Sequence, residues 1–479
     1  MEWIARVAPF AVSPLVAAAL TVACSGASTP SLAGGGGDDG GATAADATAS
    51  VTGPTFHKDV EPILQKHCQT CHREGGIAPF ALLTYGQTKP MGGSMKDQTQ
   101  RGLMPPWGAV STSECTPPFA WKNDARLSAA ELATLAAWTD DGAPEGDPKD
   151  APAPLAFGTG TLPGANTELA PRTPFVAGGD RDQFRCFVLD PKLTTTRYVN
   201  GTFVLPGNAK VVHHAVVFTD PKGESKKLVG ADGTYECAGG PRVTESGVVA
   251  VWAPGALPVE LPSNVGYPIA PGTLMVMQIH YHAAGARAVD PDTTKLQLRF
   301  TDQKPEYYLF TAGIGNFPAP ASGGDGLLPG PDDPATGPEF RIPANKKGHT
   351  ESMQWTVPSS LPNGLRLYGV MAHMHLVGVD MKIDIERAGG GGTSCLMQEP
   401  HWDFGWQRFY AYDAPLEQLP PISPGDKLHL RCTYDNTMGN AHLAAELSAQ
   451  HKEVADVVLG EQTTDEMCVT LPQLIVKAF

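Results

Sequence analysis

The stretch GVMAHMHLVG, residues 369–378, places His373 and His375 two positions apart in an otherwise apolar run. Successive side chains of a β-strand point to opposite faces, so residues i and i+2 share a face. If the stretch is a strand, the two imidazoles lie side by side on one face of a sheet, and Met374 points to the other face. The stretch therefore predicts a β-rich region in which two imidazoles are available to one ligand.

The chain on both sides of this stretch consists of short β-like runs separated by Gly and Pro turns. It contains 53 Gly and 44 Pro, and only 18% of its residues are charged, which is typical of β-sandwiches. The pattern predicts two tandem antiparallel β-sandwich domains of jelly-roll type, residues 169–305 and 306–479, with the boundary near Gln303–Tyr308. The clearest runs are RYVNGTFVLP (197–206), AKVVHHAVVF (209–218), TLMVMQIHYHA (273–283), TKLQLRFT (294–301), DMKIDIER (380–387) and DKLHLRCTYD (426–435).

The length and the net charge of the chain limit the number of its domains and the kinds of partner it can bind. A chain of 479 residues exceeds what one hydrophobic core accommodates, so two to four domains are expected. The net charge is −15, from 35 Lys and Arg against 50 Asp and Glu. A nucleic-acid partner requires basic patches that meet phosphates, so this acidic balance argues against one.

The first 23 residues are typical of a signal peptide, with one Arg, an apolar core and small residues before Cys24. A single membrane span is the alternative, although the apolar run is short for a bilayer. LTVAC resembles a bacterial lipobox, except that Leu20 lies one place further from the cysteine than usual. Cys24 is therefore a candidate for lipidation and membrane anchoring, with ordinary signal cleavage as the alternative. Residues 24–55, mostly small and polar, predict a flexible tether.

Export to the bacterial periplasm or cell surface determines the chemistry of the cysteines. Outside the cytoplasm, cysteines that hold neither lipid nor cofactor are expected to form disulfides.

Residues 56–148 predict a small all-α domain that carries haem. DVEPILQKHC has helical apolar spacing, and a second helix begins after Ser128 as its N-cap. Cys68, Cys71 and His72 form the C-x-x-C-H motif of covalent c-type haem attachment. A zinc or redox C-x-x-C is the alternative, but zinc would need a second ligand pair, and this domain offers none. A Pro-rich linker, residues 149–168, follows.

The second axial ligand of the haem is expected to be Met104, which lies on the Pro-rich loop RGLMPPWGA, with Met91 and Met95 as competitors. His/Met ligation raises the haem potential and suits electron transfer. The arrangement resembles small single-haem cytochrome c domains.

Two further histidine pairs lie on predicted strands, His213 with His214 and His280 with His282. A lone pair is more often structural, but several pairs in an exported protein favour copper or zinc. Adjacent residues of a regular strand face opposite ways, so His213 and His214 need a β-bulge or twist to share a metal. Met467 supplies a thioether, a poor zinc ligand but a good ligand for Cu(I). Copper is therefore the expected metal.

Residues from about 165 to 479 resemble the copper type II, ascorbate-dependent monooxygenases, which include peptidylglycine α-hydroxylating monooxygenase and dopamine β-monooxygenase. HH at 213–214, LMVMQIHYH at 274–282, AHMHLVG at 372–378 and GDKLHLRC…TDEMC at 425–468 carry the resemblance. It implies two β-sandwich domains that face each other across a solvent cleft, each with one copper. The implied first copper has the ligands His213, His214 and His280, and the second has His373, His375 and Met467. His282 lies on the same strand face as His280, so its position makes it an alternative ligand.

The resemblance also implies two disulfides, Cys186 with Cys237 and Cys432 with Cys468. Cys115 and Cys395 receive no assignment from it and could be free thiols or have other partners.

The activity implied by the resemblance is hydroxylation of a C–H bond of a small organic substrate. O2 would bind and react at the second copper, and the first copper would store the second electron. Ascorbate or another reductant would supply electrons, and the fused haem suggests a direct route from haem to the first copper. The peptide enzyme has an arginine and a tyrosine where this chain has Met371 and Leu471, so an apolar or aromatic substrate is expected.

Two other functions are alternatives to that of a monooxygenase. A non-catalytic haem and copper protein for electron transfer or copper handling would show reversible redox chemistry without substrate-dependent O2 uptake. A β-rich binding module with structural histidines would carry haem and no copper.

Overall fold

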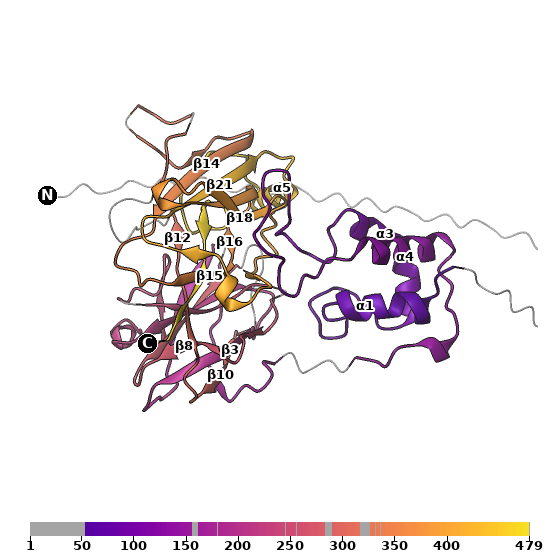
Figure 1. The fold of residues 1–479 in the computed structure, drawn as a ribbon, viewed down its shortest axis with the longest axis horizontal. Helices are drawn as coiled ribbons and strands as arrows, with labels where there is room; N and C mark the ends of the chain where they lie inside the picture. The colour runs from indigo at the N-terminus through magenta and orange to yellow at the C-terminus, as the bar shows by residue number, and fades with distance from the viewer. Residues whose placement is uncertain are drawn as a thin grey trace, which may run out of the picture. The chain divides into compact units, whose positions relative to one another are not determined.

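The computed structural model in Figure 1 describes residues 53–155, 161–179, 181–244, 246–254, 256–282, 290–316, 326–330, 332–335 and 337–478. The predicted signal peptide, Cys24 and nearly all of the predicted tether lie outside the described residues. Within the described part, no helix combines the length and the apolar character that a membrane crossing requires.

The regular elements between residues 56 and 150 are helical. Ser128 caps α4 as expected: its hydroxyl accepts from the N–H of Glu131, and the Glu131 carboxylate accepts from the N–H of Ser128. Phe56, Leu64 and Trp138 form the centre of a separate small core. The helices are η1 Phe56–Val60, α1 Glu61–His67, α2 Tyr85–Thr88, η2 Lys89–Met91, α3 Gly92–Gln100, α4 Ala129–Asp140 and η3 Pro148–Asp150.

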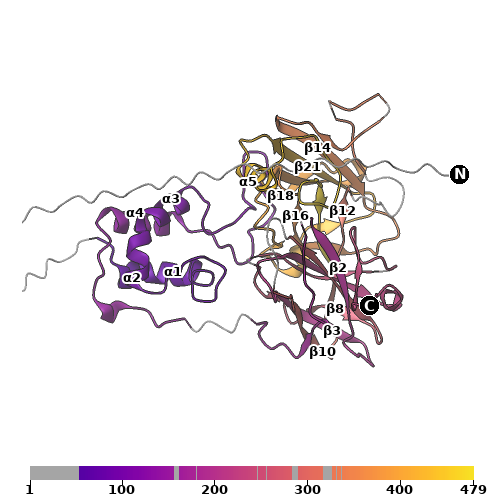
Figure 2. The ribbon, with the colours of Figure 1, turned by 180° about the vertical axis from the view of Figure 1, so that it is seen from behind.

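Residues 167–301 are β-structure, as the alternating pattern predicts. Most pairs are antiparallel, and β4, β9 and β2 lie side by side in the order β6-β4-β9-β2-β5. Figure 2 shows this region from behind, with β2, β3, β8 and β10 labelled. The strands are β1 Thr167–Leu169, β2 Gln183–Leu189, β3 Arg197–Leu205, β4 Val212–Asp220, β5 Thr234–Glu236, β6 Val248–Trp252, β7 Val259–Glu260, β8 Val265–Ile269, β9 Leu274–Tyr281 and β10 Lys295–Thr301, with one 3-10 turn, η4 Glu224–Lys227.

Residues 307–477 form a second β-rich region, in which the four-stranded sheet β14-β21-β17-β18 is the largest separate unit. The strands are β11 Tyr307–Thr311, β12 Ile314–Gly315, β13 Arg341–Ile342, β14 Lys346–Thr356, β15 Leu365–Val370, β16 Ala372–His373, β17 Gly378–Glu386, β18 Thr393–Glu399, β19 Tyr410–Ala411, β20 Pro421–Ile422, β21 Lys427–Asn436, β22 Val457–Val458, β23 Val469–Thr470 and β24 Gln473–Lys477. The helices are η5 Ala388–Gly390, η6 Leu416–Gln418 and α5 Ala441–Gln450.

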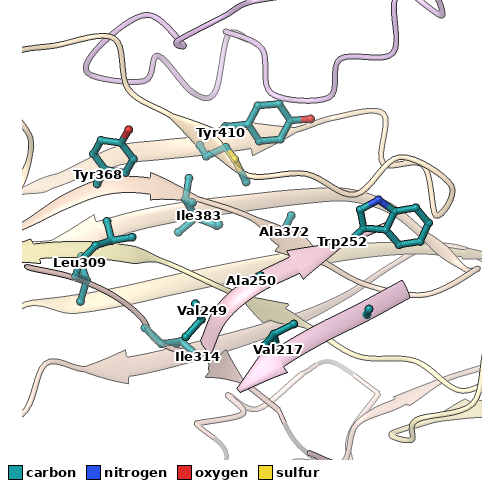
Figure 3. Packing of buried hydrophobic residues seen from close by; sticks show 14 of the residues in the cluster. Val217, Val249, Ala250, Trp252, Leu309, Ile314, Tyr368, Ala372, Ile383 and Tyr410 are labelled. Atoms are coloured by element: carbon teal, nitrogen blue, oxygen red, sulfur yellow. The ribbon is translucent and has the colours of Figure 1, made fainter. Parts of the chain in front are cut away.

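The two β regions share a sheet. β11 pairs in parallel with β8 of the first region and antiparallel with β24, the last strand of the second. One hydrophobic cluster accordingly contains residues of both regions, including Val217 and Trp252 from the first and Ala372 and Ile383 from the second (Figure 3). The boundary near 303–308 therefore falls at a strand that joins the regions.

The segment of residues 106–125 packs on the second β region. Cys115 is disulfide-bonded to Cys395, which answers the question that the resemblance left open. The Trp121 ring stacks on Tyr412 at a centroid distance of 4.9 Å, and the Lys122 N–H donates to the Ala411 carbonyl. Although this segment lies within the expected boundaries of the haem domain, it is attached to the β region by a covalent bond and by stacking.

Candidate metal centres

The first histidine cluster is built on a β-bulge. β4 and β9 pair antiparallel, with His214 opposite His280, and the register shifts between Val212 and His214. His213 is the extra residue, and a bulge of this kind turns neighbouring side chains toward one side. The structure thus contains the irregularity that two adjacent histidines need in order to face one ligand.

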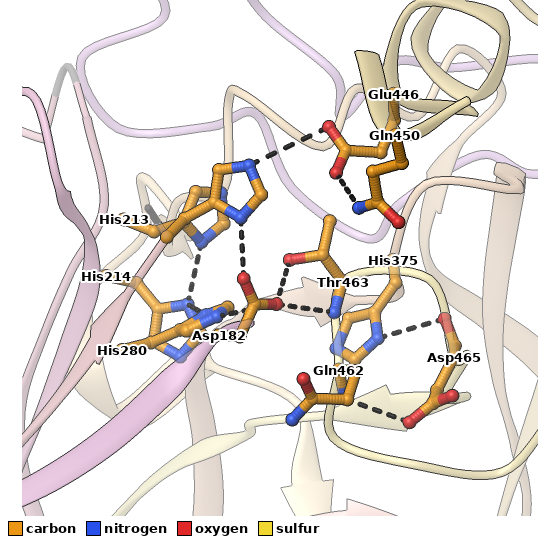
Figure 4. Close-up of polar contacts among 11 residues, drawn as sticks. Asp182, His213, His214, His280, His375, Glu446, Gln450, Gln462, Thr463 and Asp465 are labelled. Atoms are coloured by element: carbon orange, nitrogen blue, oxygen red, sulfur yellow. Dashed lines mark hydrogen bonds and ion pairs between the residues drawn. The ribbon is translucent and has the colours of Figure 1, made fainter. Parts of the chain in front are cut away.

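The three imidazoles converge through their Nδ1 atoms. Nδ1 of His214 lies 3.2 Å from Nδ1 of His213 and 3.3 Å from Nδ1 of His280. Figure 4 shows the three rings side by side. One nitrogen from each ring falls within 4.8 Å of the others, a spacing that suits a shared metal ion. Burial lowers the pKa of His213 to about 3 and that of His214 well below its ordinary value. Both rings are therefore neutral, the form in which imidazole binds metals.

The Asp182 carboxylate orients the third imidazole. Its Oδ2 lies 3.1 Å from Nε2 of His280, so Nδ1 of that ring is left for the cluster. The Phe184 ring stacks on His280 at 4.3 Å and fixes its plane. Burial alone would raise the pKa of Asp182, but the neighbouring His280 and His282 imidazoles lower it well below its usual range. A carboxylate behind a ligating histidine is a common means of fixing the tautomer and orientation of the ring.

His282 belongs to this carboxylate network instead of the metal cluster. Its Nδ1 lies 2.6 Å from Asp182 Oδ1, and its Nε2 lies 3.7 Å from a carboxylate oxygen of Glu446 on α5. The hydrogen bond with Asp182 is the largest cause that raises the pKa of His282, to about 10. Because a protonated imidazole has no free lone pair, His282 is not suited to be the alternative ligand.

The second pair, His373 and His375, lies where a strand ends. β15 pairs with β24 and β16 pairs with β23, so the chain changes partners at Met371, and β16 ends at His373. The continuous strand predicted over residues 369–378 is therefore wrong. The two imidazole centroids nevertheless lie 5.2 Å apart, as neighbours that can face one ligand.

Both rings of this pair keep one nitrogen available. Nδ1 of His373 lies 2.7 Å from Oε1 of Gln407, and Nδ1 of His375 lies 3.2 Å from the Asp465 carbonyl. Both partners are acceptors, so each Nδ1 carries the proton and each Nε2 keeps its lone pair. The pair can therefore offer two Nε2 donors to one metal ion.

Met467 is held next to His375 by a buried acid. Oε1 of Glu466 accepts from the backbone N–H of His375 and, at 2.8 Å, from that of Met467. Cys468 is bonded to Cys432, and the Tyr434 hydroxyl donates to the Met467 carbonyl at 3.1 Å. The methionine is 4% exposed and is fixed on both sides, as a thioether ligand of a defined site would require.

The two sites adjoin. The imidazole centroids of His214 and His373 are 6.2 Å apart, and the Phe404 ring stacks on His213 at 4.5 Å while lying 6.1 Å from His375. The solvent cleft that the resemblance implies between the sites is therefore closed at these residues.

Two family models match the β regions that carry these sites. Residues 179–287 match the N-terminal domain of the copper type II ascorbate-dependent monooxygenases, and residues 335–471 match the C-terminal domain. The chain belongs to this family. The ranges contain all six candidate ligands, His213, His214, His280, His373, His375 and Met467.

Two curated relatives are a tyramine beta-hydroxylase of Caenorhabditis briggsae and DBH-like monooxygenase protein 1 of Gallus gallus. The first is 25% identical over 292 residues, which is 56% of this chain and 40% of the relative. The second is 27% identical over 195 residues, 40% of this chain and 29% of the relative. The chain thus spans less than half of either relative. Among solved structures, the alignment with the major capsid protein P2 from bacteriophage PM2 covers 65% of this chain and 98% of the capsid protein. The identity is 12% and the TM-score is only 0.24.

Cys68, Cys71 and His72 of the C-x-x-C-H motif lie on one turn. Cys68 and Cys71 are free thiols, and a turn in which the N–H of His72 donates to the Cys68 carbonyl joins them. Nδ1 of His72 lies 3.2 Å from the Phe80 carbonyl, so Nε2 of this ring keeps its lone pair. Met91 and Met95 pack against the helical core. Met104 instead lines a cavity of about 700 Å³, whose lining residues do not include Cys68, Cys71 or His72.

Several residues of the site have no signal in the sequence. Asp182, Glu446 and Gln407 act on the histidines from other segments, and no periodicity or motif distinguishes them. Glu466 lies within the TDEMC stretch, but the sequence gives no sign of its contact with His375. Their roles depend on contacts between distant segments. The β-bulge, in contrast, could be inferred because two adjacent histidines could share a metal only with such an irregularity.

Proposed function

We propose that this protein is an exported copper monooxygenase that hydroxylates a C–H bond of a small organic substrate with O2. His213, His214 and His280 would hold one copper, and His373, His375 and Met467 the other. The observation that carries the proposal is the convergence of three Nδ1 atoms at a β-bulge, next to a second imidazole pair. Membership of the monooxygenase family supports the same reaction class.

The two donor sets suit different tasks. Three neutral imidazoles suit copper in either oxidation state, while the thioether of Met467 favours Cu(I). When bound, the coppers supply the redox chemistry that activates O2. The protein keeps the rings neutral by burial, fixes His280 through Asp182 and fixes His375 and Met467 through Glu466. These contacts define the ligand positions before the metal arrives.

An apolar or aromatic substrate is supported by the residues that flank the second site. Met371 and Leu471 lie opposite each other, because each backbone N–H donates to the carbonyl of the other. Neither side chain can pair with a substrate carboxylate. A peptide substrate that ends in a free carboxylate is therefore disfavoured.

Electrons would come from ascorbate or another reductant, with a covalent c-type haem on Cys68, Cys71, His72 and Met104 as the intramolecular donor. The three disulfides, including Cys186–Cys237 and Cys432–Cys468, support maturation outside the cytoplasm, in the periplasm or at the cell surface. Lipidation at Cys24 remains part of this proposal.

The first test is metal content per chain, measured on protein matured outside the cytoplasm. Two coppers and one haem iron are expected, and the His373→Ala/Met467→Ala variant should keep one copper. The matched control is His429→Ala/Met438→Ala, because His429 pairs with Glu386 at the surface and Met438 is 54% exposed. Haem without copper, or copper unaffected by the first variant, would contradict the site assignment.

A second measurement separates an enzyme from an electron-transfer protein. Both sites are buried or half-buried and adjoin each other, an arrangement that a non-catalytic haem and copper protein could also use. Substrate-dependent O2 uptake by the reduced, copper-loaded protein is expected for the monooxygenase. Reversible reduction with no O2 uptake over a panel of apolar and aromatic substrates would favour the non-catalytic function.

A further inference from the structure

The cavity of about 700 Å³ beside Met104 is lined by residues 98–108, by the end of β18 and by the loop that follows this strand. None of the six candidate copper ligands belongs to its lining. A volume in this range accommodates a small organic ligand. The lining combines apolar, aromatic and acidic side chains, among them Leu103, Met104, Trp107, Glu399 and Trp406. The cavity is therefore a candidate binding site to which the proposed function assigns no role.

Glu399, the last residue of β18, contributes a buried carboxyl group to this cavity. The residue is 2% exposed, and no described residue donates a hydrogen bond to its carboxyl group or forms an ion pair with it. The preceding residue differs, because Gln398 accepts from Thr112 at 2.7 Å and donates to Asp380 at 2.7 Å. Buried polar side chains nearly always have a hydrogen-bond partner. The Glu399 carboxyl therefore has a hydrogen-bonding capacity that a molecule in the cavity can use.

A glycine makes room for this carboxyl group. A Cβ at Gly108 would collide with Oε2 of Glu399 and would lie 3.0 Å from the Tyr410 hydroxyl oxygen. The Gly108 N–H donates to the same hydroxyl at 3.0 Å, and the Cys115–Cys395 disulfide attaches the following segment to β18. Packing of the backbone, and not pairing with another side chain, thus fixes the position of the carboxyl group.

The Arg and Asp side chains of the lining are already paired. The pairs, with their N–O distances, are Arg101–Asp97 at 3.3 Å, Arg126–Asp124 at 2.5 Å and His442–Asp403 at 3.6 Å. Arg408 is outside the lining, and its guanidinium lies over the Trp107 ring at 5.2 Å. Burial raises the pKa of Glu399 to about 8, although the charge of Arg408 acts in the opposite direction. Glu399 is therefore the carboxyl group of this lining that lacks a counter-ion.

A carboxyl group beside tryptophan rings is suited to a cationic ligand. An ammonium group next to Glu399 would lower the pKa of this acid and form charge-assisted hydrogen bonds with the carboxylate. Tryptophan is the aromatic residue that attracts cations most strongly, and Trp107 already holds the Arg408 guanidinium. Leu103 and Met104 offer apolar surface to the rest of the ligand. A divalent metal ion would need several oxygen ligands, and Glu399 supplies only one carboxyl group.

We propose that this cavity binds an organic amine, whose ammonium group pairs with the Glu399 carboxylate and whose apolar body lies against Leu103, Met104 and Trp406. The site is separate from both candidate copper centres, and its occupation requires neither of them. The inference therefore goes beyond the proposed function and does not depend on it.

The test is calorimetric titration of the full, copper-loaded chain with 2-phenylethylamine at neutral pH and without a reductant. The neutral 2-phenylethanol and the anionic 3-phenylpropionate are matched probes with the same ring. One amine per chain should bind, about tenfold or more tightly than the alcohol, because a hydrogen bond to a charged group is involved. The anion should bind most weakly. Glu399→Gln, which keeps the size of the side chain, should remove the preference for the amine. Glu386→Gln, which removes a carboxylate that pairs with His429 at the surface, should retain it.

A second measurement locates the bound amine. The electron paramagnetic resonance spectrum of Cu(II) should not change on binding, and the His373→Ala/Met467→Ala variant should bind the amine with wild-type affinity. A changed Cu(II) spectrum would overturn the proposal in favour of binding at copper.

The comparison of the three probes on wild-type protein requires no variant to fold. Failure of the amine to bind, equal affinity for amine and alcohol, or an unchanged preference in Glu399→Gln would overturn the amine site and leave the proposed monooxygenase intact. Absence of copper from the isolated protein would instead contradict the proposed function, and the three probes would still test the amine site.

Discussion

Replacement of Asp182 by Asn should weaken both the fold and the first copper site. The carboxylate contacts His280 at 3.1 Å and His282 at 2.6 Å, and it accepts from the backbone N–H of Thr463 at 2.8 Å. Thr463 lies two residues before Asp465, whose carbonyl lies 3.2 Å from Nδ1 of His375. One side chain therefore connects ligands of both sites, and its replacement should disturb the ligand positions at both.

The magnitude follows from the charge that is removed. A hydrogen bond to a charged group contributes about 1.5–3 kcal/mol, and removal of one partner from a buried ion pair costs about 3–5 kcal/mol. The Asp182→Asn substitution would leave the His282 imidazolium with Glu446 as its remaining carboxylate, at 3.7 Å. We expect the free energy of unfolding to fall by about 2–4 kcal/mol, because this second carboxylate compensates for part of the loss. Loss of an acid behind a metal-binding histidine lowers metal affinity by about 10–100-fold, and the first site should lose affinity by that factor.

The assay combines denaturant unfolding of the copper-free protein with copper titration of the folded protein. Asp232→Asn is the matched control, because Asp232 forms a partly exposed ion pair with Arg185 at 2.6 Å. Such pairs contribute about 0–1 kcal/mol, so the control should change little. An Asp182→Asn protein that unfolds at the wild-type denaturant concentration and binds two coppers with wild-type affinity would refute the reasoning.

Three further predictions concern the second β region. Burial raises the pKa of Glu399 from 4.5 to about 8, so folding takes up a proton between these two pH values. The free energy of unfolding should therefore fall by up to about 1.4 kcal/mol per pH unit as the pH rises from 4.5 to about 8. Glu399→Gln should flatten this slope in denaturant unfolding, and an unchanged slope would contradict the assignment. Gly315 has a φ of 136°, and a Cβ there would collide with the Cys468 carbonyl. Gly315→Ala should therefore destabilise the fold by about 1–3 kcal/mol. Metal analysis should show that copper is lost from the second site first. A variant with both Cys115 and Cys395 changed to Ser should lose about 2–5 kcal/mol and become sensitive to proteolysis near residues 106–125, whereas wild-type resistance would show that packing alone holds the segment.

Local patterns in the sequence were sufficient to identify much of the fold. The alternating runs fall on β3, β4, β9, β10, β17 and β21, and Ser128 caps α4. These features depend on side-chain alternation and on one hydroxyl at a helix start, both of which are short-range. The adjacency of His213 and His214 likewise predicted the bulge on β4, whereas the grouping of these residues with His280 came from the family resemblance.

Features that depend on distant contacts could not be predicted. α3 begins with Gly92 and Gly93, which disfavour helix, and Gly92 packs closely against Trp138 of α4. α5 lies in a region that otherwise resembled strands, yet it supplies Glu446 to His282. The partner of Cys115 is 280 residues away. In each case the deciding contact comes from a segment that no local window contains.

The backbone fixes the spacing of the two candidate copper sites, and this limits how the spacing can be changed. Only a few residues separate Met467 from β24. β24 pairs with β15 of the second region and with β11, and β11 in turn pairs with β8 of the first region. The first-site histidines lie on β4 and β9 of the same extended sheet. A shift along this shared sheet would move the two ligand sets relative to each other, whereas substitution of a ligand would remove a copper without altering the spacing. Substitutions where β11 meets β24 are therefore the means of testing how electron transfer depends on the distance between the sites.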